Sequence, residues 1–465
     1  MVFKQTALAA SIALALTAPL GAQAADSAEL AQIRDQIKQM RDSYEARIQA
    51  LEARLQQAET TAGNAQAKAQ QAEEKAVQAS AAPPSPPASA GAFNPEISLI
   101  LSGTYANLSQ DPANYRIAGF MPNGGEIGPG AKGFNLGESE LVLAANIDPY
   151  LRGQFTFAVT PEDTVAVEEA YIQSLGLDNG LTVKGGRYLS GIGYLNEQHS
   201  HTWDFVDAPL AYQAFLGGQF KDEGVQLKWL APTDTFLELG GEIGRGRNFP
   251  ASDRAKNGIG SAALFAHLGD DIGVSNSWRA GLSYLKTAPR ERAYGDTDTL
   301  GAPVDNLYSG DSRLAIADFV WKWSPNGNAS HTNFKLQGEY FNRREDGDLT
   351  YDSAAASAGS NTDRYAASQS GWYLQGVYQF MPRWRVGLRR DQLDSGSVDY
   401  ASNSATLAQA AFNPTKNSLM FDYSPSEFSR FRLQFAQDKS RMDATDNQMF
   451  LQYQMSLGAH GAHKY

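Results

Sequence analysis

The chain has 465 residues, a formal net charge of −12 and no cysteine. The negative charge argues against a nucleic-acid-binding protein, and the lack of cysteine excludes disulfides and thiol catalysis. Tyr (20), Phe (22) and Gly (43) are abundant although the mean hydropathy is −0.40. This combination is typical of a transmembrane β-barrel, whose strands present apolar side chains at alternate positions only, and also of a large soluble all-β protein.

Residues 1–24 predict a secretory signal peptide. Lys4 precedes an apolar stretch over residues 7–20, and the tripeptide AQA at 22–24 supplies an A-x-A cleavage site. An uncleaved membrane anchor is the alternative, but the apolar stretch is short and rich in alanine. We therefore expect export, with a mature chain that begins at Ala25.

Residues 25–80 predict an α-helical coiled coil in the periplasm. Apolar and small residues recur at alternating steps of three and four, with one additional step of four between Tyr44 and Ile48. This is a heptad pattern with one stutter, and a helix of this kind buries its seam by self-association. A solitary charged helix is the alternative for residues 58–79, where the seam is only alanine. The Pro-rich segment 81–93 predicts an extended linker.

Residues 94–465 predict an all-β domain, namely an antiparallel transmembrane β-barrel of about sixteen strands. Apolar and polar residues alternate along each segment; Phe431, Leu433 and Phe435, for example, are separated by polar residues, as in a strand with one apolar and one polar face. The expected strands lie near 97–108, 134–147, 151–160, 165–175, 181–188, 224–230, 236–245, 262–269, 277–286, 313–323, 332–344, 371–380, 384–393, 417–423, 430–438 and 447–457.

The connections between these segments favour a membrane barrel over a soluble sandwich. Short turns follow every second strand, whereas most of the other connections are long and polar, such as 109–133, 287–312, 345–370 and 394–416. Short turns at one rim and long loops at the other are typical of bacterial outer-membrane barrels. A soluble sandwich gives no reason for such an alternation.

This organisation resembles a general porin, and in particular the phosphate-selective porin O and P family with its trimeric relatives that carry a coiled coil. Locally the resemblance depends on EEAYIQSLGLDNGLTVKGGRYLSGIG at 168–193. It implies a water-filled barrel in the outer membrane of a Gram-negative cell, surrounded by lipid and lipopolysaccharide. It further implies a homotrimer formed through the coiled coil and the barrel walls, and passive diffusion of small hydrophilic solutes. TonB-dependent receptors are excluded because no plug domain precedes the barrel.

The connection 189–223 is the candidate constriction loop, because the corresponding loop of such porins folds into the lumen. It is rich in aromatic and apolar residues such as Trp203 and Phe215, which an external loop would not expose to water. Its candidate pore-lining residues are Glu197, His199, His201, Asp204 and Asp207.

Strand parity predicts which charged side chains of the wall face the lumen. The basic ones are Arg152, Lys184, Lys228, Lys335, Arg385, Arg389, Arg430 and Arg432. The acidic ones are Glu138, Glu140, Glu238, Glu242, Glu339, Asp391, Asp422 and Asp438. Each is either a residue that controls conduction or a solvated wall residue. Because the candidate constriction loop is acidic and carries histidine, phosphate selectivity is not carried over from the resemblance.

The sequence bears on three other functions. An enzyme is not expected, because no G-x-S-x-G motif lies near a strand end. A zinc-linked uptake channel or receptor is an alternative, with His199 and His201 as ligands beside Glu197 and Asp204, although histidines hydrogen-bonded within a folded loop explain the same pattern. His460 and His463 are expected at the periplasmic end, distant from that loop. The last alternative is a structural tether, in which the coiled coil attaches the barrel to the cell envelope.

Overall fold

The computed structural model describes residues 38, 41, 42, 45, 49, 95–122, 127–159, 164–252 and 257–458. The chain forms two compact units, Met1–Ala92 and Phe93–Tyr465. The predicted signal peptide and Pro-rich linker lie outside the described residues, as do His460 and His463. Of the predicted coiled coil, the five described residues are helical and exposed, and Arg41 Nε lies 3.6 Å from Glu45 Oε1 one turn further on. The coiled coil itself stays a prediction.

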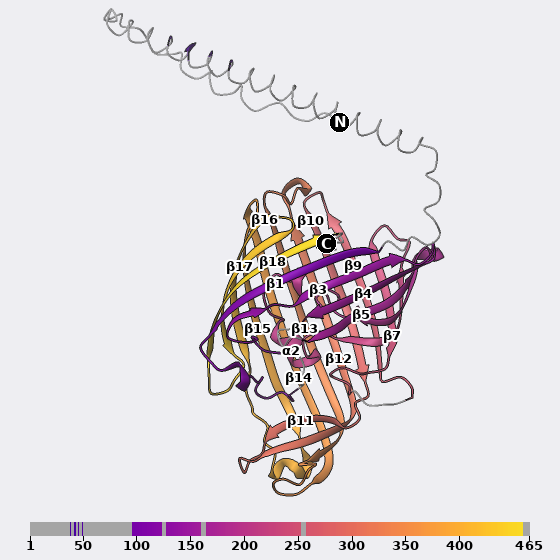
Figure 1. The fold of residues 1–465 in the computed structure, drawn as a ribbon, viewed down its shortest axis with the longest axis vertical. Helices are drawn as coiled ribbons and strands as arrows, with labels where there is room; N and C mark the ends of the chain where they lie inside the picture. The colour runs from indigo at the N-terminus through magenta and orange to yellow at the C-terminus, as the bar shows by residue number, and fades with distance from the viewer. Residues whose placement is uncertain are drawn as a thin grey trace, which may run out of the picture. The chain divides into compact units, whose positions relative to one another are not determined.

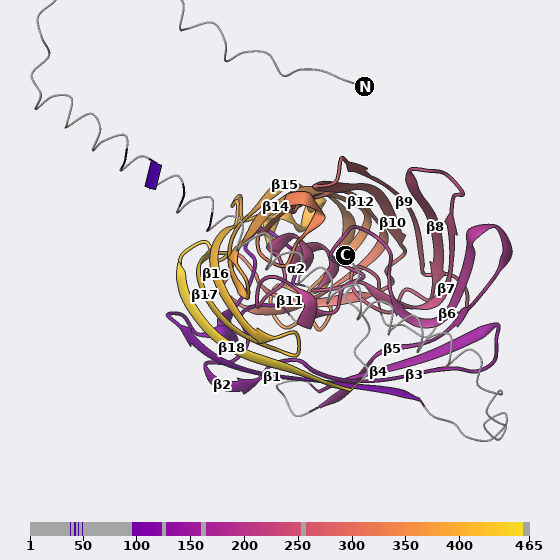
Figure 2. The same cartoon turned by 90° about the horizontal axis from the view of Figure 1, so that it is seen from above.

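The second unit is a closed antiparallel β-barrel, seen from the side in Figure 1 and from above in Figure 2. Its first and last strands pair with each other from Ser98–Gly458 to Leu108–Gln448, which closes the sheet. The strands are β1 (Glu96–Leu108), β2 (Gly133–Leu136), β3 (Ser139–Asn146), β4 (Leu151–Val159), β5 (Val165–Ser174), β6 (Leu181–Leu189), β7 (Lys221–Leu230), β8 (Phe236–Gly244), β9 (Ser261–Ile272), β10 (Asn276–Thr287), β11 (Arg292–Thr297), β12 (Pro303–Trp323), β13 (Asn333–Tyr351), β14 (Asn361–Met381), β15 (Trp384–Asp399), β16 (Thr415–Ser426), β17 (Ser429–Lys439) and β18 (Asp446–Gly458).

The eighteen described strands occupy sixteen positions around the barrel. This is because β2 and β3 both pair with β1, and β10 and β11 both pair with β12. Every predicted strand segment overlaps a strand of the structure, so the predicted all-β, sixteen-position antiparallel barrel is confirmed. The described helices are short: α2 (Leu210–Leu216), η1 (Pro112–Asn114), η2 (Asp178–Gly180), η3 (Ser200–Thr202), η4 (Pro325–Gly327) and η5 (Ala401–Ala405). No helix among the described residues is long and apolar enough to cross a membrane.

Two of the predicted long loops are wrong. Segments 287–312 and 345–370 contain β11, the first part of β12, the end of β13 and the start of β14, and β12 and β14 are each 21 residues long. These extensions pair with one another and bury a cluster that includes Tyr308, Tyr351 and Tyr365. Most of their outer residues are polar and their apolar residues face inward, so the apolar outer face that identified the other strands is missing here.

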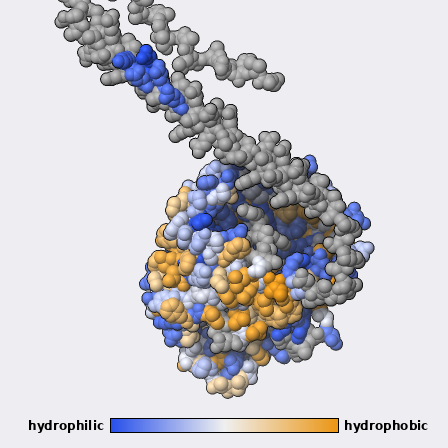
Figure 3. Space-filling view, turned by 45° about the horizontal axis from the view of Figure 1, so that its top comes forward, coloured by the Kyte–Doolittle hydropathy of each residue, from blue (hydrophilic) through white to orange (hydrophobic). Residues whose placement is uncertain are grey.

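The wall of the barrel is apolar outside and polar inside. On β17, Phe431 and Phe435 are 45% and 42% exposed, whereas Arg432 and Gln434 between them are 1% and 0% exposed. Figure 3 shows hydrophobic side chains gathered on the outer face of the barrel in that view. A soluble protein has the opposite arrangement, since water-facing strands expose their polar side. A closed barrel with an apolar outer surface is the arrangement that suits a lipid bilayer.

The connection Ser190–Phe220 folds into the barrel between β6 and β7. Both ribbon views place α2 inside the ring of strands (Figures 1 and 2), and all seven residues of α2 are buried. The ring of Phe215 stacks on Phe341 of β13 at a centroid distance of 5.9 Å, and Tyr212 meets the same ring edge-on at 5.1 Å. The aromatic residues of this segment, referred to below as the inner loop, therefore pack on the inner wall.

Candidate functional site

The inner loop begins with contacts to two buried carboxylates of the wall. Glu242 of β8 accepts hydrogen bonds from Ser190 Oγ (2.6 Å) and Gly191 N (2.8 Å). Glu339 of β13 accepts from the backbone N–H groups of Tyr194 (3.1 Å) and Leu195 (3.0 Å). Hydrogen bonds to carboxylates are stronger than neutral ones, so these two side chains fix the point where the chain turns into the barrel.

Gly193 permits this close approach. Its φ is +68°, and a Cβ atom at this position would lie 2.4 Å from Glu339 Oε2. Only glycine adopts such a conformation without strain and leaves room for the carboxylate. Glycine is therefore required at this position by both its backbone and its neighbour.

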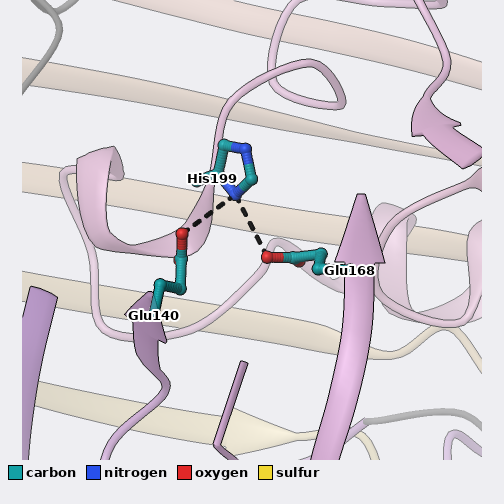
Figure 4. A group of neighbouring side chains, drawn as sticks. All are labelled: Glu140, Glu168 and His199. Atoms are coloured by element: carbon teal, nitrogen blue, oxygen red, sulfur yellow. Dashed lines mark hydrogen bonds and ion pairs between the residues drawn. The ribbon is translucent and has the colours of Figure 1, made fainter. Parts of the chain in front are cut away.

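Two histidines of the inner loop meet carboxylates of the wall beyond this turn. His199 Nδ1 lies 3.1 Å from both Glu140 Oε2 and Glu168 Oε2, as Figure 4 shows. On the other side of the ring, His199 Nε2 lies 3.0 Å from Glu169 Oε2. His201 Nδ1 lies 2.9 Å from Glu140 Oε1. We refer to these five residues as the histidine cluster.

The charge state of His199 follows from its surroundings. Burial disfavours the imidazolium and lowers the pKa of His199, but the nearby carboxylates, Glu140 first among them, outweigh burial and raise that pKa well above its usual range. In the absence of another cation, the ring is therefore protonated at neutral pH and compensates part of the negative charge around it.

A β-bulge brings two adjacent glutamates to the same side of the wall. Thr156 of β4 pairs with Glu169 of β5, but the next residue, Phe157, pairs with Val167. The additional residue, Glu168, interrupts the alternation of side chains. Glu168 and Glu169 both approach His199 for this reason, and both are buried. The sequence prediction missed both glutamates. Strict strand alternation places only one of two neighbours on the inner face, so it could not predict that both lie there.

In the second half of the inner loop the charges of loop and wall are exchanged. Aspartates of the loop contact basic groups of the wall. Asp204 forms ion pairs with Lys335 of β13 and with Arg385 Nη1 of β15 at 3.0 Å. Arg385 also pairs with Asp422 of β16. Although burial raises the pKa of Asp204, Lys335 and Arg385 outweigh it and lower that pKa below its usual range.

Asp207 has a similar set of partners. Its carboxylate lies 3.0 Å from Arg389 Nη2 and 2.7 Å from Lys416 Nζ, and it accepts a hydrogen bond from Gln434 Nε2 at 2.8 Å. Here too burial raises the pKa, but Lys416 and Arg389 outweigh it and lower the pKa of Asp207 below its usual range. The guanidinium of Arg389 also lies 4.7 Å from the ring centre of Phe205. We refer to Asp204 and Asp207 with their basic partners as the aspartate anchors.

The remaining predicted wall cations divide between the inner loop and other partners. Lys228 pairs with Glu197 of the loop, and Arg430 Nη2 donates to the carbonyl of His201 at 3.0 Å. Arg432 does not contact the loop and forms a double hydrogen bond with Asp422 at 2.8 and 3.0 Å. The other two lie elsewhere on the wall: Arg152 pairs with Glu96 at 2.6 Å, and Lys184 Nζ lies 4.5 Å from the ring centre of Tyr171.

Several of these residues differ from their predicted environment. Arg389 and Arg432 were expected to face lumen water, but they are 3% and 1% exposed, because carboxylates of the inner loop and of neighbouring strands cover them. The zinc alternative would have Glu197 and Asp204 assist the histidines as metal ligands, but these carboxylates pair with lysine and arginine instead. Lys416 was missed, although it has the same parity as Asp422, because the predicted strand began one residue later.

No family model matches this chain. An uncharacterized protein of Aquifex aeolicus (strain VF5) is 30% identical over 403 residues, which cover 82% of this chain and 81% of that protein.

Several solved structures show a likeness of fold at low identity. The outer membrane protein OmpT of Vibrio cholerae has a TM-score of 0.47 at 11% identity, over 78% of this chain and 97% of that one. The outer membrane channel DcaP of Acinetobacter baumannii has a TM-score of 0.46 at 11% identity, over 78% and 97%. An anion-selective porin from Comamonas acidovorans has a TM-score of 0.47 at 11% identity, over 78% and 99%. By its sequence, the chain belongs to the same protein family as the Aquifex aeolicus protein.

Proposed function

We propose that this protein is an outer-membrane porin that allows passive diffusion of small hydrophilic solutes. The observation that carries the proposal is an inner loop held inside a closed barrel by charged groups of its wall. A barrel of sixteen strands is wide enough for a water-filled channel. A loop folded into it reduces the cross-section and sets which solutes pass.

The outer surface supports a membrane location. The strands expose leucine, phenylalanine and tyrosine outward and bury charged and amide side chains inward. In lipid, every backbone group must find a partner within the protein, and a closed barrel achieves this for its strands. The proposal further includes export of the chain and a barrel surrounded by lipid and lipopolysaccharide. It also places the N-terminal helix in the periplasm.

Diffusion through the protein tests this function directly. The folded full-length chain is reconstituted into liposomes, and swelling is measured with sugars of increasing size. We expect swelling with small sugars that declines steeply as sugar size increases, together with discrete conductance steps in planar bilayers. A correctly inserted barrel that shows neither swelling nor conductance would refute the proposal.

The role of the N-terminal segment distinguishes the porin from the tether. The heptad pattern supports self-association, and the resemblance to trimeric porins supports a homotrimer, which cross-linking of the full-length chain tests. Deletion of residues 26–92 should leave the conductance of each barrel unchanged if the protein is a porin. Loss of envelope attachment without any solute diffusion through the intact protein would favour the tether.

The resemblance to the phosphate-selective porins in particular, rather than to porins in general, stays a prediction. The inner loop has three carboxylates and neither lysine nor arginine between Ser190 and Phe220. Its nearest wall cations are paired with those carboxylates or with others. Few basic groups are left for an anion to bind, so we propose no phosphate selectivity. Reversal potentials under a salt gradient measure the ion preference.

A further inference from the structure

The histidine cluster contains three ligand-type atoms that converge from separate segments. Glu140 projects from β3, Glu168 from the bulge of β5, and His199 from the inner loop (Figure 4). One carboxylate oxygen of each glutamate and one ring nitrogen of His199 all lie within 4.8 Å of one another. The two nitrogen–oxygen distances are both 3.1 Å. Ligand atoms bound to a common zinc ion at about 2.0–2.2 Å lie roughly 3.0–3.5 Å apart.

Hydrogen bonding alone does not satisfy this arrangement. Nδ1 of an imidazole carries at most one hydrogen, and here the nitrogen is equally close to two carboxylate oxygens. It forms a hydrogen bond with Glu168 Oε2. Glu140 Oε2 is buried and lies 3.1 Å from the same nitrogen, and it has no hydrogen-bond donor of its own among the described residues. A buried carboxylate oxygen without a donor is costly, and a cation at the shared position would satisfy both oxygens.

We propose that Glu140 Oε2, Glu168 Oε2 and His199 Nδ1 bind a divalent transition-metal ion, with zinc as the representative ion. The ion takes the place of the Nδ1 hydrogen. This site goes beyond the proposed diffusion function, because it would hold a cation whether or not solutes pass through the barrel.

The groups around the three ligands have the positions that metal sites require. A metal-bound histidine usually donates its other ring N–H to a carboxylate or carbonyl, which fixes the ring, and Glu169 Oε2 lies 3.0 Å from His199 Nε2. Bound carboxylates are in turn held by hydrogen bonds, and His201 contacts the second oxygen of Glu140 at 2.9 Å. The two histidines therefore have different roles, since His199 is a ligand and His201 positions one.

The ligand types select the class of metal ion. One imidazole nitrogen with two carboxylate oxygens suits zinc and neighbouring divalent transition metals. Calcium and magnesium favour sites made only of oxygen. Three carboxylates contact the two imidazoles, and a fourth, Glu138, contacts Ser200 between them. This excess of negative charge favours a divalent cation over the single proton of an imidazolium.

Equilibrium binding of zinc to the folded, untagged full-length chain in detergent tests the proposal. Isothermal titration calorimetry should give one zinc ion per chain from this site. His199→Ala and Glu168→Gln should each raise the Kd for zinc by about tenfold or more, because each removes a ligand. His267→Ala is the matched control, since His267 Nδ1 also contacts a carboxylate, Glu238, at 3.0 Å, but these two residues belong to no described group of three ligands. It should leave the Kd unchanged.

A second measurement separates loss of the site from loss of folding. Co²⁺ absorbs visible light with an intensity that depends on the arrangement of its ligands. His201→Gln retains all three ligands but removes the group that positions Glu140, so the spectrum of the Co²⁺-loaded chain should change. Variants with His460 and His463 replaced by alanine remove a competing pair near the C-terminus and should retain the site. The proposal is overturned if the wild type binds no zinc, or if folded His199→Ala and Glu168→Gln bind it with the wild-type Kd.

Discussion

The two halves of the inner loop contact the wall with opposite chemistry. In the histidine cluster, imidazoles of the loop meet carboxylates of β3 and β5. In the aspartate anchors, carboxylates of the loop meet lysine and arginine of β13, β15 and β16. The aspartate anchors have basic partners in excess and keep their charges over a wide pH range. The histidine cluster has carboxylates in excess and needs a proton or a metal ion.

This difference assigns different roles to the two halves. Ion pairs between groups that are charged at neutral pH hold the loop in place there. A cluster that depends on an added cation can respond to its surroundings. We therefore expect removal of an aspartate anchor to release the loop, and changes in the histidine cluster to adjust its stability.

The largest expected effect comes from Asp207→Ala. It leaves Arg389 and Lys416 buried, each with one carboxylate partner fewer, and breaking a buried ion pair by removing one member costs about 3–5 kcal/mol. Chymotrypsin treatment of the folded barrel checks this, because the inner loop contains Tyr194, Trp203 and Phe205 as cleavage sites. We expect rapid cleavage within the loop. A variant as resistant as the wild type would show that the anchor does not hold the loop.

Acidification should release the same anchors at a defined pH. Because the pKa values of Asp204 and Asp207 are lower in the folded state, their contribution to loop stability is fully present above about pH 4, the ordinary value for Asp. It is lost as the pH falls through the folded-state values. Conductance should therefore be constant from pH 7 to about pH 4 and increase below. A wild-type conductance that increases between pH 7 and 5 would contradict this assignment.

His201→Ala should have a smaller effect than loss of an anchor. It removes the donor that faces Glu140 Oε1, and a buried acceptor left without its donor costs about 1–3 kcal/mol. The free energy of unfolding in urea, measured without added metal, provides the comparison. If His201→Ala destabilised the barrel more than Asp207→Ala, the ranking of the two halves would be wrong.

The smallest effect is expected at an exposed ion pair. Arg364 Nη2 lies 3.1 Å from Asp346 Oδ2, and both side chains are more than 60% exposed. Such pairs contribute about 0–1 kcal/mol. Asp346→Asn should change neither unfolding in urea nor cleavage by chymotrypsin. A change as large as that of Asp207→Ala would mean that loss of any carboxylate, anchored or not, destabilises the barrel.

The sequence predicted the barrel because a lipid-facing strand must alternate. Phe431 and Phe435 mark one strand in this way, and each predicted segment found by that rule overlaps an observed strand. The rule failed in the extensions around Asp311 and Asp346, which pair with each other, because their outer residues are mostly polar and their apolar residues face inward. It also failed at strand ends. The predicted strand began one residue after Lys416, so this side chain was not identified as facing inward.

The inner loop was recognised from its aromatic content, but its contacts were not predictable. The bulge at Glu168 is a local departure from alternation, and no spacing of residues in the sequence predicts it. The partners of His199 lie about 30 and 60 positions earlier in the chain and are brought to it by the pairing of β3 and β5 with β4 and by the folding of the inner loop into the barrel. The function of the loop as a constriction stays a prediction, as do the signal peptide and the coiled coil.

Single-channel conductance of the double variant Asp204→Asn with Asp207→Asn tests the central claim most directly. At pH 7 both side chains lose the charge that pairs with Lys335, Arg385, Arg389 and Lys416, so the inner loop should leave its position in the barrel. We predict a larger conductance than that of the wild type, and faster swelling with sugars that the wild type excludes. An unchanged conductance in a variant whose loop chymotrypsin cleaves would contradict the claim that this loop restricts diffusion.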